Sequence, residues 1–219
     1  MQYIFTHFRG FILLQSLCFI LIGQSKYPVD SVITNPDVSI LRKFSILPIA
    51  GWQRISYNTD FLNCQYYPSC SNYGAEAIHL HGILFGSFMA ADRIVRCNPA
   101  AYYYHTEIGM VIDSAGYLVD PVKPNPSGNQ SKSPLLAAAL SALLPGSGRM
   151  YSGRVYEGLI GGLMTFLLGQ IAYEAYLQNR PIKTSLFTAI FAVAYGGEIY
   201  GAYRTAKYYI PQPNQGTIP

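Results

Sequence analysis

Charged residues are scarce in this chain. Only 12% of its 219 residues are Asp, Glu, Lys or Arg, against ~25% in typical soluble domains, and half are hydrophobic. The mean hydropathy is accordingly positive, at +0.18. The net charge of +4 includes no block of Lys and Arg dense enough to bind a nucleic acid. The composition argues against a soluble enzyme and favours a membrane-bound protein whose mild positive excess suits an anionic bilayer.

Cysteine is also scarce, which excludes a disulfide-rich scaffold. Of the four cysteines, Cys18 lies in the first apolar run, and Cys64, Cys70 and Cys97 remain. Three cysteines permit one disulfide with a free thiol, or three thiols. The count leaves the redox compartment open.

Long hydrophobic runs are absent near the start of the chain. The first run, 11–22, has only about 12 residues, whereas a spanning helix needs ~20. Its length fits the core of a signal peptide, and Gly23 and Ser25 are small enough to follow as a cleavage signal. Residues 1–25 are therefore predicted to be a signal peptide or an uncleaved membrane anchor.

Residues 26–49 are predicted to be an amphipathic connecting segment. The stretch SILRKFSILPIAGWQRIS (39–56) indicates a short helix that Pro48 and Gly51 interrupt. Its apolar residues include Leu41, Phe44 and Ile55, and its basic residues are Arg42, Lys43 and Arg54. Such a helix can lie in a membrane interface with its cations toward the headgroups. A solvated helix packed on the next domain is the alternative.

Apolar spacing predicts two helices between Ser71 and Arg96, separated by Gly82, with Ser71 as the N-cap. Asp92 and Arg96 are four residues apart and can pair. Residues 98–133 have a loop-like composition, and 126–133 read as a linker.

Two long apolar stretches, 155–177 and 184–203, follow the linker and are joined by QNRPIK. Each is long enough to span a bilayer. The predicted fold class is therefore all-α, with a small cysteine-framed helical domain (50–125), a transmembrane helical hairpin (134–208) and a tail (209–219).

The hairpin carries acidic and small residues. An intramembrane carboxylate is a candidate functional group, but for the deepest one, Glu198, pairing with Arg204 or Lys207 is the more common outcome. The acidic residues are Glu157, Glu174 and Glu198. Gly158-x-x-x-Gly162 and Gly197-x-x-x-Gly201 predict close packing of the two helices or dimerisation.

A glycine-rich turn precedes the hairpin. It resembles the P-G-x-G-x-x-Y-x-G signature of small two-helix membrane domains and predicts a tight entry turn. The residues are Pro145, Gly146, Gly148, Tyr151 and Gly153.

The stretch CQYYPSCSNYGAEAIHLHG (64–82) concentrates Cys, His and Tyr. A zinc site is disfavoured because Cys-x5-Cys is wider than the common spacing and Cys97 follows 27 positions later. A thiol nucleophile lacks a group that would orient His81. We therefore expect structural cysteines, with no catalytic residue, no metal and no cofactor.

Residues 64–99 resemble the YidD family of membrane protein insertion efficiency factors. The family pattern runs C-R-[FY]-x-P-[TS]-C-S-x-Y-[AG]-x-E-A-[IL]-x-x-H-G, then R-C-H-P and D-P-V. The principal matches are Cys64, Tyr66, Pro68, Cys70, Ser71, Tyr73, Glu76, His81, Gly82, Arg93, Arg96, Cys97, Pro99, Asp120 and Pro121. Gln65 and Asn98 replace the family's Arg and His, and the tyrosine-rich stretch before Asp120 is an insertion.

The resemblance implies a non-enzymatic protein that assists insertion of integral membrane proteins beside the insertase and translocon. Its partners are membrane lipids and nascent membrane proteins, and no nucleic acid is expected. The cations expected to bind the membrane surface are Arg42, Lys43, Arg54, Arg93 and Arg96. Two alternatives are an envelope redox or metal-binding protein using Cys64, Cys70 and Cys97, and a transporter subunit built on the hairpin.

Sidedness rests on two opposing signals. A cleaved signal peptide would export the cysteine domain. The cations flanking the hairpin outnumber those of its connecting loop and favour the cytoplasm for the domain. They are Arg149, Arg154, Arg204 and Lys207, against Arg180 and Lys183. The family resemblance agrees, and we predict the cytoplasmic face of the inner membrane.

Overall fold

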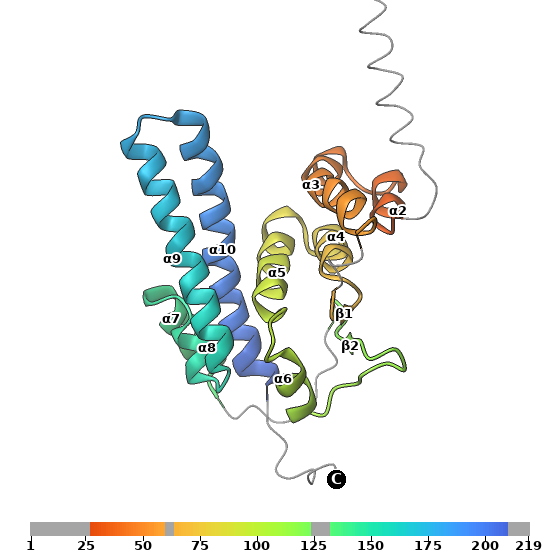
Figure 1. Cartoon of the computed structure of the whole chain (residues 1–219), viewed down its shortest axis with the longest axis vertical. Coiled ribbons are helices and arrows are strands. Elements are labelled where there is room, and N and C mark those ends of the chain that lie inside the picture. Colours follow the sequence, from red (N-terminus) through yellow and green to blue (C-terminus); the bar gives the residue numbers. More distant parts are fainter. Residues whose placement is uncertain (1–26, 60–63, 124–131, 210–219) are drawn as a thin grey trace, which may run out of the picture.

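The computed structural model describes residues 27–59, 64–123 and 132–209 (Figure 1). The predicted signal or anchor segment, most of the linker and nearly all of the tail lie outside the described residues. The described chain is mostly helical, as predicted, with α2 (Val29–Thr34), α3 (Ile40–Ser56), α4 (Cys70–His81), α5 (Ile83–Arg96), α6 (Ala101–Glu107), α7 (Pro134–Leu143), α8 (Ser147–Tyr151), α9 (Val155–Leu177) and α10 (Pro181–Tyr208).

Residues 98–133 are not the continuous loop that their composition predicted. They contain α6 and the strand β2 (Leu118–Val119), which pairs in parallel with β1 (Tyr66–Tyr67). Buried Tyr66 and Leu118 pack with Ala101 in a small core of their own. Long-range packing therefore orders a segment whose local sequence is turn-like.

The helix α3 runs without interruption through Pro48 and Gly51, contrary to the prediction. Pro48 cannot donate to the carbonyl of Phe44, but both residues are exposed, so water can satisfy that carbonyl. The opposite face packs Ile46 and Ala50 against α2 and α4. Gln53, fully buried, accepts from the backbone N–H of Val29 (3.2 Å) and donates to Asn72 of α4 (2.6 Å).

The prediction of two helices hinged at Gly82 is confirmed by α4 and α5. Ser69, rather than Ser71, caps α4, since its Oγ accepts from the backbone N–H of Asn72. Gly82 has φ +84°, a conformation that favours glycine. A Cβ at Gly86 would lie 2.4 Å from Cα of Ile78, so a glycine there lets α5 fold back closely on α4.

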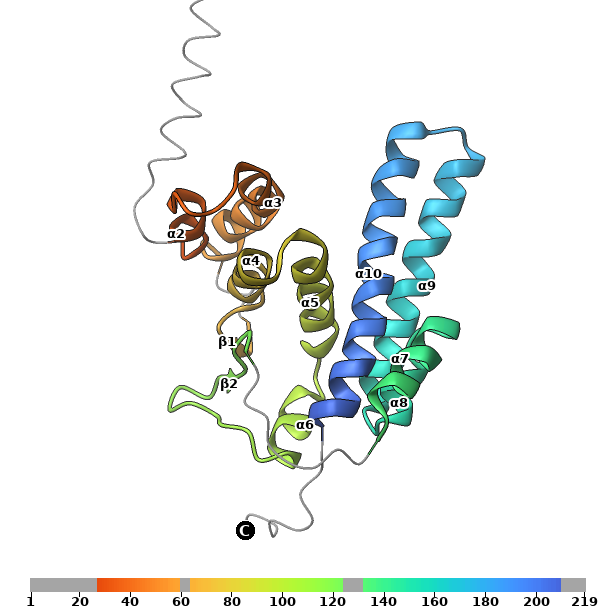
Figure 2. The ribbon, with the colours of Figure 1, turned by 180° about the vertical axis from the view of Figure 1, so that it is seen from behind.

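At the other end of the chain, α9 and α10 form an antiparallel hairpin, with α7 and α8 at its base, and α5 packs along the lower half of α10 (Figures 1 and 2). The distal half of the hairpin projects beyond this contact. Among the described residues, α9 alone is long and apolar enough to cross a membrane.

The two Gly-x-x-x-Gly motifs do not form the contact between α9 and α10 that the spacing predicted. Gly158 and Gly162 face the backbone of Pro145 and Gly146, before α8. Gly197 faces Ala91 of α5. Another glycine, Gly161, supplies the close approach of α9 to Glu198 of α10.

Candidate functional site

Arg149 is the centre of a buried charge network that joins the two halves of the molecule. Its side chain is fully buried and donates to Asp92 of α5 (2.7 Å), Glu198 of α10 (2.8 Å) and Glu157 of α9 (3.3 Å). Arg154 adds a second cation beside Glu157, at 2.5 Å. The expected pairing of Glu198 with Arg204 or Lys207 is therefore wrong: α8 places Arg149 closer.

Asp120, the acidic residue of the D-P-V motif, is a second centre. It is ion-paired with Arg93 and Arg96 of α5 and with Arg204 of α10, the last at 2.9 Å. Arg96 also pairs with Asp92 at 2.9 Å, as its spacing predicted, and so links the two centres. The network carries five arginines and four carboxylates.

Aromatic rings cover this network on the side of the cysteine domain. The guanidinium of Arg93 lies 3.9 Å from the ring centroid of Tyr66 and 4.7 Å from that of Tyr73. It also donates to the carbonyl of Pro68 at 3.0 Å. In this chain, these contacts join aromatic residues from the first half of the motif to an arginine from its second half.

Burial and the arginines act in opposite directions on the two aspartates. Burial by itself raises the pKa of Asp92, but the charges of Arg96 and Arg149 outweigh it and lower the pKa to about 2. The pKa of Asp120 also falls well below its usual range, because Arg96, Arg204 and Arg93 outweigh burial. Both carboxyls are therefore ionised at neutral pH, and neither is suited to exchange protons there.

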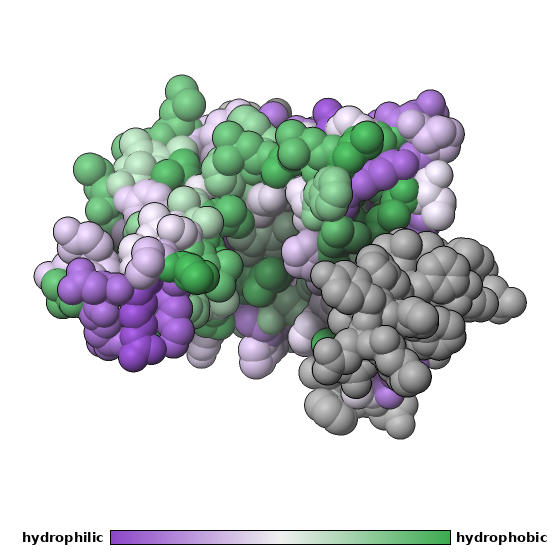
Figure 3. All heavy atoms as spheres, turned by 90° about the horizontal axis from the view of Figure 1, so that it is seen from above, coloured by the Kyte–Doolittle hydropathy of each residue, from purple (hydrophilic) through white to green (hydrophobic). Residues whose placement is uncertain are grey.

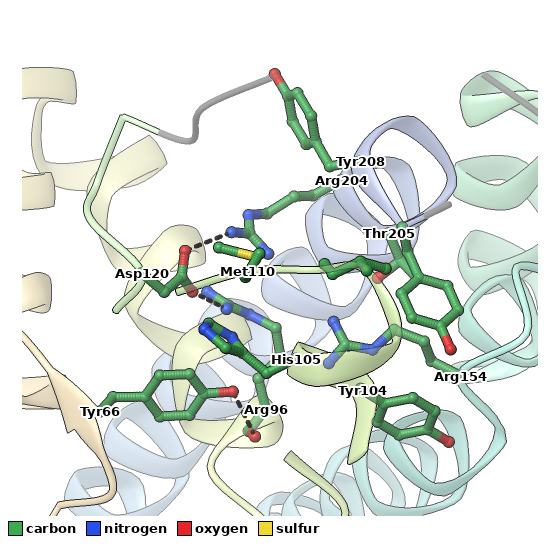
Figure 4. Close-up of a pocket in the computed structure, with 12 residues that line it drawn as sticks. Tyr66, Arg96, Tyr104, His105, Met110, Asp120, Arg154, Arg204, Thr205 and Tyr208 are labelled. Atoms are coloured by element: carbon green, nitrogen blue, oxygen red, sulfur yellow. Dashed lines mark hydrogen bonds and ion pairs between the residues drawn. The ribbon is translucent and has the colours of Figure 1, made fainter. Parts of the chain in front are cut away.

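A small cavity lies beside Asp120 between α5, α6 and the end of α10 (Figure 4). Its volume of about 30 Å³ is enough for about two waters. Arg154 and Arg204 line it, each with an Nε that has no hydrogen-bond partner among the described residues. Ordered water suits this cavity better than an organic substrate does.

The three cysteines of the domain meet at one corner. Cys64 precedes β1, Cys70 begins α4 and Cys97 follows α5. The three sulfurs lie within 4.8 Å of one another, with no disulfide between them. Hydrogen bonds from the Cys70 and Cys97 thiols lower the pKa of Cys64.

The outer face of α3 is an apolar stripe. Its members follow helical spacing and are 41–73% exposed: Ile40, Leu41, Phe44, Leu47, Trp52 and Ile55. Leu84 and Phe85 at the start of α5 are also exposed, at 63% and 59%. Seen from above, hydrophobic atoms extend over much of this side of the molecule (Figure 3).

Two of the five cations predicted to bind the membrane surface are in the interior. Arg93 and Arg96 are at most 2% exposed and pair with Asp92 and Asp120, so that prediction is wrong for them. Arg42, Lys43 and Arg54 are partly exposed on α3. Arg42 donates to the carbonyl of His79, and Arg54 pairs with Asp30 at 3.0 Å.

The other predicted motif residues divide by exposure. Tyr66 and Tyr73 are buried, whereas Glu76 and His81 are exposed on α4. Ser71 accepts from Gln53 at 3.1 Å. Pro99 and Pro121 lie at the exposed ends of the insertion. The packing of the domain therefore explains the tyrosines but does not require Glu76 or His81.

The hairpin signature builds the turn around α8. Gly146 and Gly153 have φ of +91° and +100°. A Cβ at Gly148 would lie 1.9 Å from the carbonyl oxygen of Ala137 in α7. Tyr151 packs on the buried alanines between α7 and α10. This turn places Arg149 in the charge network. Sequence patterns did not reveal this role, because the partners of Arg149 lie eight to 57 positions away along the chain.

Comparison with known proteins also separates the cysteine domain from the hairpin. Residues 41–105 match the YidD family, described as "Putative membrane protein insertion efficiency factor". Three similar proteins carry that name. The one from Oleidesulfovibrio alaskensis is 49% identical over 27% of this chain and 69% of its own length, and the one from Exiguobacterium sp. is 41% identical over 27% and 66%. The one from Pseudomonas entomophila is 34% identical over 42% of this chain and 95% of its own length. No solved structure matches this chain.

The family match ends before α7, so it does not reach the hairpin or its signature. The resemblance of that signature to two-helix membrane domains stays a prediction. The match does not favour the alternative of an envelope redox or metal-binding protein as the function of the chain.

Proposed function

Because this chain belongs to the YidD family of membrane protein insertion efficiency factors, we propose that it assists insertion at the inner membrane, from the cytoplasmic face and without catalysing a reaction. Its proposed partners are membrane lipids, nascent membrane proteins and the insertase or translocon beside which they enter. The family match spans most of α3 and extends through α5 into α6, the part of the chain that carries the apolar stripe.

The observation that carries this proposal is the exposed stripe on α3. A soluble helix turns its apolar face inward, whereas α3 buries Ile46, Ala50 and Gln53 and leaves Phe44 and Trp52 65% and 51% exposed. Aligned exposed apolar side chains mark a membrane or protein contact. Arg42 and Lys43 flank the stripe, as in helices that lie in an anionic interface.

The hairpin supports a membrane location independently. At 1.5 Å per residue, the 23 residues of α9 extend roughly 35 Å, enough for a hydrocarbon core of ~30 Å. Its large side chains face outward, with Leu163, Phe166 and Leu167 49–61% exposed. The buried charges lie toward its base, where Arg149 pairs with Glu157 and Glu198. We propose that the hairpin spans the membrane and anchors the domain.

The two surfaces are oriented compatibly. The hairpin runs vertically in Figures 1 and 2, whereas α3 is seen nearly end-on in both, so α3 lies across the hairpin axis. In both views α3 lies level with the upper part of the hairpin, the part that projects beyond the contact with α5. In this position, the stripe and the exposed Leu84 and Phe85 can receive an apolar segment that is leaving water.

An insertion assay in cells tests this proposal. A strain lacking its own family member would express the chain, and the membrane-inserted fraction of a pulse-labelled multispanning protein would be measured by protease protection. We expect Phe44→Gln with Trp52→Gln to lose most of the gain in insertion that the unchanged chain provides, because the polar amides weaken apolar contact.

Val111→Gln is the matched control, since Val111 is 66% exposed but lies away from α3. It should insert the reporter as the unchanged chain does. Full activity of the double α3 variant, at equal abundance in the membrane, would overturn the proposal.

A further inference from the structure

The cysteine corner has the geometry of a metal site, and we propose that Cys64, Cys70 and Cys97 bind a zinc ion as thiolates. This inference goes beyond the proposed function, because it concerns what holds the domain together. Thiolate ligands select soft or borderline cations such as zinc over magnesium or calcium.

The distances between the sulfurs fit one shared ion. With Zn–S bonds of ~2.3 Å in tetrahedral geometry, two sulfurs on the same ion lie about 3.8 Å apart. The sulfurs of Cys64 and Cys70 are 3.4 Å apart, and all three fall within 4.8 Å. A disulfide would require ~2.05 Å between two of them and would leave the third without a partner.

Neighbouring donors reach two of the three sulfurs, those of Cys64 and Cys97. The backbone N–H of Cys70, at the first position of α4, donates to Sγ of Cys64 at 3.3 Å. The side-chain amide of Gln65 lies 3.7 Å from Sγ of Cys97 and donates to the carbonyl of Asn98 at 3.0 Å. Hydrogen bonds of this kind orient metal ligands and stabilise their charge.

Exposure determines what completes the coordination. Cys97 is exposed, whereas Cys64 and Cys70 are partly buried, so the corner opens to solvent on the side of Cys97. Three protein ligands leave a fourth position for water or an external ligand. The ion would tie the segment before β1 and the start of α4 to the end of α5, 27 positions beyond Cys70, and would thereby stabilise the domain.

Metal analysis of the purified full-length chain in detergent, under reducing conditions, tests the site. We expect about one zinc ion per chain, and Cys64→Ser, Cys70→Ser and Cys97→Ser should each retain much less. Cys18→Ser is the matched control and should keep the full amount. A wild-type chain that takes up no zinc, or a Cys64–Cys70 disulfide in unreduced peptides, would overturn the proposal.

A second measurement does not depend on the variants folding. In the unchanged chain, replacement of zinc by Co²⁺ should produce the visible absorption of a tetrahedral thiolate site. Removing zinc with a chelator should make the thiols of Cys64, Cys70 and Cys97 reactive toward a maleimide, as mapped by peptide mass. Thiols equally reactive with and without zinc would contradict the site, and the insertion assay would be unaffected by that result.

Discussion

Arg149 is the residue on which the contact between the hairpin and the domain depends. Its guanidinium donates to three carboxylates from three helices, and no part of it is exposed. Several bonds from one planar group satisfy charges whose burial would otherwise be costly. Without this side chain, Glu198 would lose its ion pair among the described residues, whereas Asp92 would keep Arg96 and Glu157 would keep Arg154.

Replacing Arg149 by Leu should therefore destabilise the protein strongly. Breaking a buried ion pair costs roughly 3–5 kcal/mol, a large part of a typical total of about 5–15 kcal/mol. Thermal unfolding in detergent, followed by circular dichroism, measures the change. Arg180→Leu, in the exposed loop of the hairpin, is the control and should melt like wild type. Equal melting of the two variants would refute the role given to Arg149.

Asp92 predicts a dependence of stability on acid. Its folded-state pKa of about 2 lies below the ordinary value of 3.8, so its ionised form stabilises the fold above about pH 4, and this contribution is lost as the pH falls to 2. The difference corresponds to about 2 kcal/mol. The free energy of unfolding of Asp92→Asn, measured with a denaturant, should be lower than that of the unchanged chain at neutral pH and should change less between pH 4 and 2. If the two proteins lose stability equally over that range, Asp92 does not titrate there.

At the scale of elements, α3 divides its apolar residues between the core and the surface. It contributes Ile46, Ala50 and Gln53 to the core and presents a full apolar stripe outward. Its tryptophan is the one Trp of the chain, which makes that stripe accessible to fluorescence.

Trp52 should lie among lipid acyl chains when the full-length protein is reconstituted in anionic vesicles. We expect lipids that are brominated on their acyl chains to quench its fluorescence. Acrylamide, which stays in the water, should quench the reconstituted protein less than it quenches the unfolded chain in the absence of detergent. Quenching by acrylamide alone would show that α3 faces water and would contradict an interfacial helix.

Lys43→Gln should weaken the attachment of α3 at low salt by about 1 kcal/mol, with less effect at high salt.

Two helical glycines should respond oppositely to the same substitution. A Cβ at Gly201 of α10 would lie 1.9 Å from a nitrogen of Arg149 and 2.3 Å from Oδ1 of Asp92, so Gly201→Ala should destabilise by roughly 1–3 kcal/mol. A Cβ at Gly51 of α3 would meet nothing within 4 Å, and Gly51→Ala should stabilise by about 0.5–1 kcal/mol. Their melting temperatures should move apart; a shift in the same direction would refute the packing of α10 on Arg149.

At the scale of the whole molecule, the ion pairs Asp92–Arg149 and Asp120–Arg204 join the domain to the hairpin. The P. entomophila relative is 95% covered by an alignment of 91 residues, so it has no room for a comparable hairpin. This chain therefore combines the family's domain with a helical hairpin that this relative does not share.

The position of the domain in the cell can be tested with introduced cysteines. Three of the cations that favour the cytoplasm, Arg149, Arg154 and Arg204, are buried in the folded protein, but the positive-inside rule acts on the chain as it inserts. We expect a membrane-impermeant maleimide to label Gln178→Cys in intact cells, and Ser114→Cys only after permeabilisation, each compared with the unchanged chain. The reverse pattern would place the domain outside.

Local sequence patterns determined the longer helices and the family of this protein, but not α6. Apolar spacing located α4, α5 and α9, and the motif from Cys64 to Pro99 identified the YidD resemblance, because helix periodicity and short motifs depend on neighbouring residues. The same patterns misjudged Pro48, since a proline in a helix is tolerated where its missing hydrogen bond faces water.

Only the tertiary structure decided which charges are buried and which glycines pack against what. Arg93 and Arg96 look like surface cations in sequence but face Asp120, and Arg149 meets Asp92 57 positions away. Cys97 likewise reaches Cys64 and Cys70 only because α5 folds back on α4. Electrostatic pairing and ligand geometry depend on distances in space, and spacing along the chain does not encode distances between helices that meet through long-range packing.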